Sequence, residues 1–327
     1  MGGEITMKKK GLIILLILAL GTISLLGLYD QVVKAKEYPS KPITWVVPFG
    51  TGGGSDQFAR MMEKQMEKVS DAEIVVINIP GAKTAVGINY LQQQPANGYT
   101  VFGATTDSVI SMVTGSTPFG LKDIKPVAKV QHNVDMLFIG QGEKRFSDFQ
   151  GMIDYAKQNP GELSIATTGL NGADALNIRA IEEAKNIEFK IVPFSKPGER
   201  YAALAGGHVD ILYEQPGDVL SFLKADKYKP VISMTEERVT GFKEVPTTVE
   251  RGIDVTAGYW RSVWVKKETP QKAINYLNDL IKKAVNTEEY KKYERRKYLH
   301  LRSKLLTGDD FREFLEKEYE YYNQVMN

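Results

Sequence analysis

Ile43–Met66 reads ITWVVPFGTGGGSDQFARMMEKQM and combines a buried-strand pattern, a glycine turn and an amphipathic helix. Its first residues are β-branched or aromatic and nearly continuous, which is typical of a strand covered on both faces. Gly50 and Gly52–Gly54 then allow a sharp turn that exposes backbone N–H groups. The helix follows, with Ser55 or Asp56 available as its cap. A helix N-terminus after such a turn favours an anion, because its amides are unpaired and its dipole is positive.

The same turn is equally compatible with a plain connection between a strand and a helix. It lacks the G-K-[ST] ending of a nucleotide phosphate loop, and TGGGSD does not match the dinucleotide pattern G-x-G-x-x-G. Neither nucleotide-binding fingerprint is therefore present. The rest of the chain has to decide between a structural turn and a ligand site.

The N-terminus predicts export. Lys8–Lys10 precede an uncharged apolar run, Gly11–Leu28, and Val33–Ala35 offers small residues for cleavage. We expect residues 1–35 to be a signal peptide, or an N-terminal membrane anchor because the run is just long enough to span a bilayer. The protein would then act outside the cytoplasmic membrane, in the periplasm or at the extracellular face. The chain has no cysteine, which excludes disulfides and a lipid-modified cysteine.

The remaining chain has the composition of an ordinary soluble globular protein. The full chain of 327 residues is long enough for two domains. Beyond residue 35 the acidic and basic residues are equal in number, so the sequence carries no basic footprint for nucleic acid.

Strand and helix patterns alternate along this part of the chain, as in a wound, mostly parallel sheet. We expect further strands at 74–79, 99–104, 134–140, 163–166, 189–193, 209–213, 230–234 and 259–265. We expect helices at 85–94, 146–158, 175–185 and 199–205, and three more at the C-terminal end. Ligands of such sheets bind beyond the carboxyl ends of the strands, where Thr105 and Thr106 follow the third strand.

A second polar turn repeats the opening arrangement. Thr167–Asp174, TTGLNGAD, lies between a strand and a helix, as the first turn does. Two wound units, each with an amide-rich turn after its first strand, indicate two lobes that face each other across a cleft. This repetition favours a ligand site over a plain connection.

Several stretches spread over more than 200 residues resemble the tripartite tricarboxylate transporter receptors, also called Bug-type or TctC-like solute-binding proteins. The matching stretches are YPSKPITWVVPFGTGGGSD, PGA, ANGYTVFGAT, NPGELSIATTG, VPF-x-x-P-G, LAGGHVDIL, VPTTVERG and YWRSVWV. The resemblance implies an α/β, two-lobed periplasmic-binding-protein clamshell (type II-like), in which each lobe is a wound, mostly parallel sheet with flanking helices. It places lobe 1 at 36–138 and 262–327 and lobe 2 at 139–261, with crossings near 134–140 and 259–265.

The resemblance also implies a receptor that needs no cofactor and delivers a small di- or tricarboxylate, or a related organic acid, to membrane transport subunits. We expect a monomer. In the family, one turn of each lobe holds the ligand, mainly through backbone amides and ordered water. Carried onto this chain, the expected ligand residues of the two turns are Phe49, Thr51, Gly52, Gly53, Ser55, Asp56, Thr168, Gly169, Asn171, Gly172, Ala173 and Asp174. We add Thr105 and Thr106 for their place after the third strand, and Glu214 and Arg261 as candidates in the cleft.

Three charged positions leave alternatives open. Many members of the family have a histidine shortly after the second turn, where this chain has Asp174-Ala175-Leu176. Asp174 either caps its helix or faces the cleft, where it would favour a ligand with a positive group. Arg261 is either a bidentate clamp for a carboxylate or a hinge arginine paired with an acidic neighbour. Glu214 either selects a hydroxyl or ammonium group or lies on the surface.

Two other functions compete with the receptor. An exported enzyme on the same fold has little support, because no G-x-S-x-G is present and none of His132, His208 and His300 adjoins a candidate nucleophile. We therefore predict no catalytic residues, and the spacing of His, Asp and Glu predicts no metal site. A subunit that reports ligand occupancy to a signalling membrane protein would have the same sequence features as a transport receptor.

Overall fold

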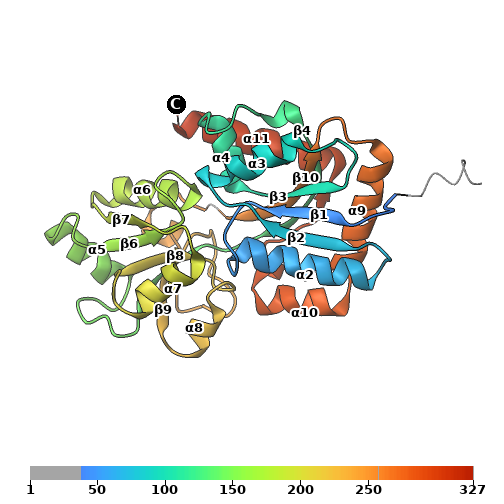
Figure 1. Cartoon of the computed structure of the whole chain (residues 1–327). Coiled ribbons are helices and arrows are strands. Elements are labelled where there is room, and N and C mark those ends of the chain that lie inside the picture. The colour runs from blue at the N-terminus through green and yellow to red at the C-terminus, as the bar shows by residue number, and fades with distance from the viewer. Residues whose placement is uncertain (1–37, 257, 327) are drawn as a thin grey trace, which may run out of the picture. The chain divides into compact units, whose positions relative to one another are not determined.

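The computed structural model describes residues 38–256 and 258–326. Residues 41–327 form one compact unit, and this unit contains two separate β-sheets with helices packed on them (Figure 1). The signal peptide or anchor expected at residues 1–35 lies outside the described part. None of the described helices is both long enough and apolar enough to cross a membrane.

The first sheet has six strands in the order β11-β4-β10-β3-β1-β2. Its strands are β1 (Ile43–Val47), β2 (Ile74–Asn78), β3 (Thr100–Thr105), β4 (Ile124–His132), β10 (Trp260–Lys266) and β11 (Leu306–Thr307). β1 pairs in parallel with β2 and β3, whereas β10 runs antiparallel to β3 and β4. Four of the five β1 side chains are buried, as the continuous apolar pattern predicts.

The second sheet has five strands in the order β7-β6-β8-β5-β9. Its strands are β5 (Met136–Gly140), β6 (Ser164–Thr167), β7 (Lys190–Pro193), β8 (Ile211–Glu214) and β9 (Tyr228–Ser233). β6 is parallel to β7 and β8, and β5 runs antiparallel to β8 and β9. β5 thus has the position that β10 has in the first sheet, since each is the strand that arrives from the other sheet. The prediction of two wound, mostly parallel sheets is confirmed.

Helices cover both faces of the first sheet. Figure 1 shows α3, α4 and α11 on one side and α2 and α10 on the other. The helices are α2 (Gly54–Lys68), α3 (Ala85–Gln93), α4 (Thr106–Val113), α5 (Phe149–Gln158), α6 (Ala173–Lys185), α7 (Pro197–Ala205), α8 (Leu220–Lys224), α9 (Gln271–Val285), α10 (Glu288–Arg296) and α11 (Gly308–Met326). On α11, Phe311, Leu315 and Tyr322 are buried in one cluster with Trp260 and Trp264, so these side chains form part of the hydrophobic core.

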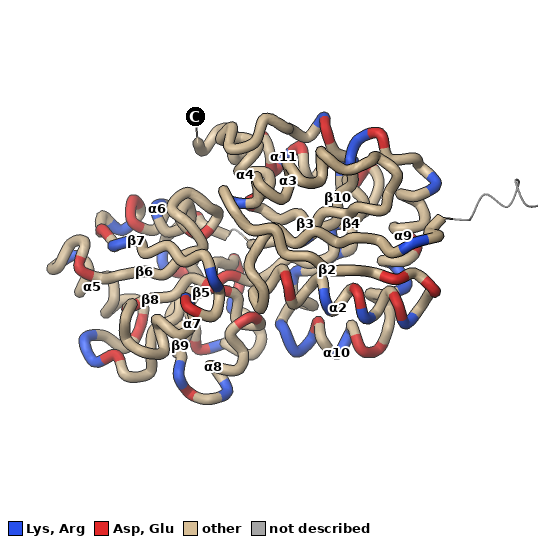
Figure 2. The backbone as a smooth tube through the Cα atoms, viewed as in Figure 1, with Lys and Arg blue, Asp and Glu red and all other residues tan. Residues whose placement is uncertain are grey.

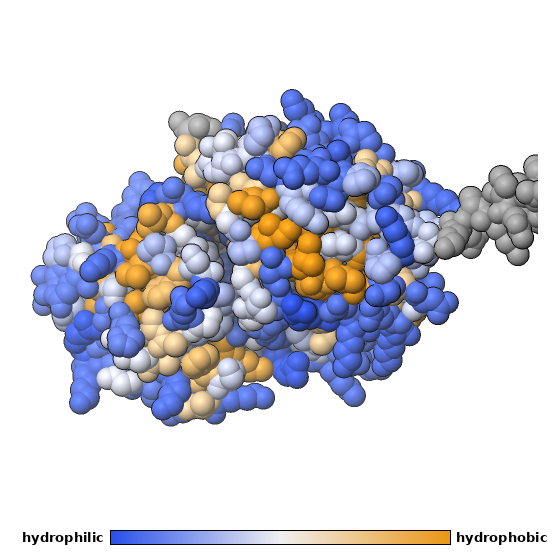
Figure 3. Space-filling view, viewed as in Figure 1, coloured by the Kyte–Doolittle hydropathy of each residue, from blue (hydrophilic) through white to orange (hydrophobic). Residues whose placement is uncertain are grey.

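Charge is balanced over the surface. Figure 2 shows basic and acidic residues interspersed along α2 and α10. Figure 3 shows several apolar areas, one of them over the region of β2, an edge strand on which Val75 is 40% exposed. In the view of Figure 2, basic and acidic residues lie on both sheets and their helices, and neither sign is confined to one side.

Four elements were missing from the sequence prediction, namely β4, α4 and the short α8 and β11. The strand β4 contains Lys125, Pro126 and Lys129, and a proline within an apolar run argues against a strand. Pro126 is tolerated because it lies opposite Trp264, where the β4–β10 register shifts. The helix α4 begins directly at Thr106, without the glycine turn that marks α2.

We call the first sheet with its helices the first lobe and the second sheet with its helices the second lobe. The chain leaves the first sheet after His132, enters the second at Met136 and is back in the first at Trp260. The finer limits at residues 138 and 262 remain predictions.

Candidate functional site

The turn between β1 and α2 is held together by a carboxylate. Asp56 accepts hydrogen bonds from the Gly52 amide at 2.9 Å, Asn78 Nδ2 at 3.0 Å and Arg60 Nε at 3.1 Å. Burial raises the pKa of Asp56, but these donors outweigh it and leave the pKa below its usual value. The helix has Gly53 as its N-cap and no side-chain cap. Asp56 therefore stabilises the turn before the helix, and the expected cap from Ser55 or Asp56 is not formed.

Asp174 has the corresponding role in the second lobe. Its Oδ2 accepts from the Thr168 amide at 2.5 Å and from Thr168 Oγ1 at 2.8 Å, while Oδ1 accepts from the Ala175 amide at 2.8 Å. The residue also lines a cavity between the turns. The expected helix cap is not formed, because the N-cap of α6 is Gly172 and has no side-chain cap; Asp174 instead bonds the turn before α6 and lines the cavity.

Asp107, at the start of α4, joins the lobes. Its Oδ1 accepts from the Ala173 amide of α6 at 2.9 Å, and its Oδ2 accepts from the Tyr259 hydroxyl at 3.0 Å. Burial and the nearby charge of Asp174 raise the pKa of Asp107 to about 6. The Ala173 amide, an expected ligand contact, is thus bonded to a carboxylate of the protein itself.

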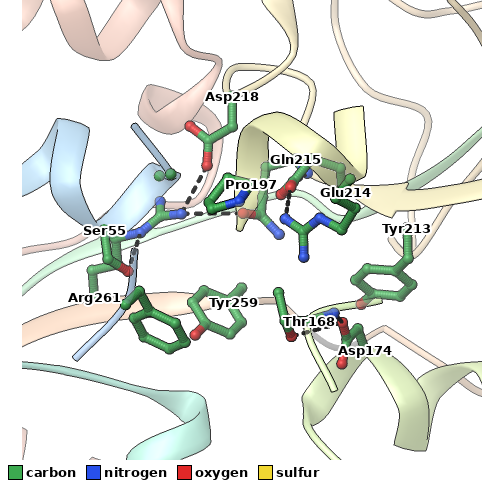
Figure 4. Close-up of a pocket in the computed structure, with 14 residues that line it drawn as sticks. Ser55, Thr168, Asp174, Pro197, Tyr213, Glu214, Gln215, Asp218, Tyr259 and Arg261 are labelled. Carbon is green, nitrogen blue, oxygen red and sulfur yellow. Dashed lines mark hydrogen bonds and ion pairs between the residues drawn. The ribbon is translucent and has the colours of Figure 1, made fainter. Parts of the chain in front are cut away.

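Arg261, on β10, is the centre of a buried polar network between the lobes (Figure 4). Its Nη2 lies 2.8 Å from Asp218 Oδ2, and Lys297 Nζ lies 3.2 Å from Asp218 Oδ1. The other hydrogen bonds of the guanidinium go to Ser55, Gln131, Asn133 and Gln215, at 3.1–3.4 Å. Burial raises the pKa of Asp218, but the charges of Arg261 and Lys297 outweigh this and lower it. Arg261 is thus paired with an acidic neighbour, as a hinge arginine would be.

Glu214 forms a second buried ion pair, with Arg200 of α7. Burial raises the pKa of Glu214, and the charge of Arg200 offsets this only in part. Glu214 is 3% exposed, so it is not a surface carboxylate. Within the described residues, Arg200 Nε has no hydrogen-bond partner.

Two cavities that share Phe49 and Thr168 lie between the turns. The first has a volume of about 50 Å³. Its lining residues are Phe49, Gly53, Gly54, Ser55, Thr168, Asp174, Pro197, Arg200, Tyr213, Glu214, Gln215, Asp218, Tyr259 and Arg261 (Figure 4). The second has a volume of about 390 Å³. Its lining residues are Pro48, Phe49, Gly50, Pro80, Gly81, Ala82, Lys83, Thr84, Asp107, Thr168, Gly169, Gly172 and Ser195.

The structure brings together most, but not all, of the residues predicted from sequence. The predicted residues at the cavities are Phe49, Gly53, Ser55, Thr168, Gly169, Gly172, Asp174, Glu214 and Arg261. Those that line neither cavity are Thr51, Gly52, Asp56, Thr105, Thr106, Asn171 and Ala173. Thr105 and Thr106 are buried and bond to Tyr259 and the Trp260 amide, and Asn171 bonds to Arg179. These side chains therefore shape the turns and the return strand.

Sequence reasoning missed several lining residues. Tyr213 and Gln215 adjoin Glu214, so the signal that singled out Glu214 extended to them. Asp218 and Arg200 gave no such signal, because their partners Arg261 and Glu214 are distant in sequence. Lys83 directly follows the PGA stretch that carried part of the resemblance. No group of acidic or histidine side chains suited to a metal ion is found among the residues that the structure describes.

Comparison with known proteins identifies the family. A model of the tripartite tricarboxylate transporter family receptor matches residues 58–300, which is more than half of the chain. The chain belongs to this receptor family. The family consists of periplasmic solute-binding receptors and is not a family of enzymes.

Individual relatives agree with this assignment. A UPF0065 protein from the tcbD–tcbE intergenic region of Pseudomonas sp. is 28% identical over 254 residues, which cover 76% of this receptor and 75% of that protein. MatC from Rhodopseudomonas palustris with bound malate has a TM-score of 0.79 at 20% identity, covering 89% of this receptor and all of MatC, 100%. A second R. palustris protein, with adipate, has a TM-score of 0.79 at 21% identity, covering 88% and 97%. These likenesses confirm the two-lobed fold.

A pH-dependent stability is expected from Asp135, which lies behind the site. Asp135 accepts from the Tyr213 hydroxyl and from Gln215 Nε2, both at 2.8 Å, and burial raises its pKa to about 7. Between pH about 4 and 7 the folded state binds this proton and the unfolded state does not. Asp135 therefore lowers stability as pH rises through this window, by up to about 1.4 kcal/mol per pH unit.

Unfolding in urea at pH 5 and pH 7 measures this effect. Asp135→Asn should remove the contribution, so that the variant gains stability relative to the wild type on going from pH 5 to pH 7. The control Asp154→Asn changes an exposed residue of α5 and should alter the free energy of unfolding by the same amount at pH 5 and at pH 7. Equal pH dependence in the wild type and Asp135→Asn would contradict the buried, protonated carboxyl.

Proposed function

We propose that this receptor is exported, captures a small carboxylate between its lobes and delivers it to the membrane subunits of a tripartite tricarboxylate transporter. The observation that carries the proposal is that the two turns, which are more than 100 residues apart and follow strands of different sheets, line common cavities through Phe49 and Thr168. Both turns end at the N-terminus of a helix, where an anion is favoured. MatC with malate and the R. palustris protein with adipate have the same fold and support a carboxylate ligand.

In this mechanism the two lobes move as rigid bodies and close on the ligand. The ligand would favour the closed form only if it contacts both turns there, because a ligand shifts an equilibrium only by its differential affinity. The network around Arg261 joins residues of both lobes and would limit the motion to a hinge. We propose that residues 1–35 direct export or anchor the receptor, and that binding does not lead to chemistry.

A thermal-shift titration of the purified full-length chain tests the proposal. The ligands are succinate, malate, adipate and citrate, with aspartate and glutamate as ligands that carry a positive group and glucose as the uncharged control. A ligand that binds only the folded state adds about 2.7 kcal/mol at 100 times its Kd. We expect the melting temperature to rise with at least one carboxylate and to stay constant with glucose. No rise with any carboxylate would reject the proposed ligand class.

A further inference from the structure

The loop before α3 has an unusual backbone. Gly81 has φ of 135°, and the three residues after it also have positive φ: 42° at Ala82, 48° at Lys83 and 78° at Thr84. Positive φ is uncommon for residues other than glycine, and three in succession require that the surroundings impose the conformation. Such backbone conformations cluster at ligand clamps and active sites. The backbone of Ala82–Thr84 therefore marks this loop as a candidate ligand contact.

Buried polar groups hold this loop in place. Ser111, on α4, donates its hydroxyl hydrogen to the Lys83 carbonyl, and its Oγ also lies 3.5 Å from Thr84 Oγ1. Thr84 and Ser111 are both fully buried. The hydrogen bond from buried Ser111 thus fixes the backbone of Lys83, and the Lys83 side chain lies on the side of the cavity.

The Lys83 side chain crosses from the first lobe to the turn of the second. A methyl group added at Gly169 would lie 3.3 Å from Lys83 Cε, which shows how closely the lysine side chain approaches the backbone of the second turn. Lys83 lines the 390 Å³ cavity together with Phe49, Gly169 and Gly172. Within the described part of the chain, its ammonium group has no hydrogen bond or ion pair. Its pKa is lowered, chiefly by burial, which is the cost of bringing this charge into the cavity.

Two carboxylates lie near Lys83, but both have other partners. Asp107 is bonded to the Ala173 amide and the Tyr259 hydroxyl, and Asp174 is bonded to Thr168. Their charges attract the ammonium without forming a contact with it. The lysine thus offsets the negative charge at the second turn and keeps its three hydrogen-bond donors for a ligand.

We infer that Lys83 binds a carboxylate of the captured solute in the cavity between the two turns, and that this contact ties the loop of the first lobe to Gly169 of the second. The inference rests on the proposed function and names the side chain that supplies the positive charge. The cavity volume is within the usual range for small-molecule sites. A charge-assisted hydrogen bond in such a site is stronger than one between neutral groups.

Isothermal titration of the full-length chain with succinate, malate, adipate and citrate tests the inference. Lys83→Met keeps the length of the side chain and removes the charge, and it should weaken carboxylate binding by about 10–100-fold. Lys83→Arg keeps the charge and should recover most of the affinity. Lys157→Met is the matched control, because it makes the same change in net charge at an exposed position of α5. The melting temperature without ligand should be equal or higher in Lys83→Met, since a desolvated charge is removed.

The outcomes separate the two proposals. If the wild type binds a carboxylate and Lys83→Met binds it as tightly as Lys157→Met does, Lys83 is not a ligand contact and the receptor function stands. If Lys83→Arg is as weak as Lys83→Met, charge at this position does not bind the ligand, and the inference is overturned. If the wild type binds none of the four carboxylates and neither aspartate nor glutamate, both proposals fail.

Discussion

Arg261→Met is expected to lower the free energy of unfolding by about 3–5 kcal/mol, the usual cost of removing one partner of a buried ion pair. The variant leaves Asp218 buried with Lys297 as its remaining cation, at 3.2 Å. It also leaves polar atoms of Gln131, Asn133 and Gln215 without their shared donor. Unfolding in urea, followed by circular dichroism, measures the loss.

A double-mutant cycle separates this effect from a simple loss of packing. Asp218→Asn combined with Arg261→Met should cost less than the sum of the two single changes, because the uncompensated charge is gone. Arg238→Met is the control: its partner Glu250 is an exposed surface residue, so stability should change little. Additive effects of Arg261→Met and Asp218→Asn would show that the pair does not act as a unit.

Gly53→Val is expected to weaken carboxylate binding by about 10–100-fold while the protein stays folded. A Cβ atom at Gly53 would lie 2.7 Å from Pro197 Cγ, across the junction between the first turn and α7 of the second lobe. Overpacking of this kind costs about 1–3 kcal/mol, and here the lobes can avoid it by remaining apart. In the proposed mechanism the ligand contacts both turns, so we expect the cost to fall on binding. Titration with malate or adipate measures the affinity.

Gly172→Val tests the same site from the second turn, since its Cβ would lie 3.0 Å from Asp107 Oδ1 and Asp174 Oδ1. Gly198→Val is the matched control beside Pro197, where an added Cβ meets nothing within 4 Å. We expect the control to bind as the wild type does. Unchanged affinity in both Gly53→Val and Gly172→Val would reject a site formed by the two turns.

The two turns show how far local sequence reaches. Glycines after an apolar strand predicted the bend at Gly50–Gly54, and the repeat of this pattern at Thr167–Asp174 predicted the second lobe. Both predictions depend on backbone conformation and burial, which residues within one turn or strand determine. The order of the strands could not be predicted in this way, because β10 lies between β3 and β4 although it is more than 100 residues away from them in the chain.

Arg261 shows what local sequence leaves open. As a residue of YWRSVWV it was equally a ligand clamp or a hinge arginine, and its position on β10 did not favour either. Asp218, 43 residues earlier in the chain, faces it only because the second lobe folds against β10. The same holds for Asp107, whose partner amide at Ala173 is 66 residues away in the other lobe.

By itself, the sequence predicted the two wound units, their polar turns and the lack of a nucleic-acid footprint. These predictions follow from periodicity, glycine positions and charge balance, all of which can be read without the fold. The resemblance to the tripartite tricarboxylate transporter receptors came from matching stretches along the chain, and the family model confirms it. Only the tertiary structure decided that Arg261 pairs with Asp218, that Asp107 accepts the hydrogen bond of the Ala173 amide, and that the Lys83 side chain lies close to Gly169. Electrostatic contacts depend on distances between side chains in the folded protein, and residues far apart in the chain acquire those distances only when the lobes have formed.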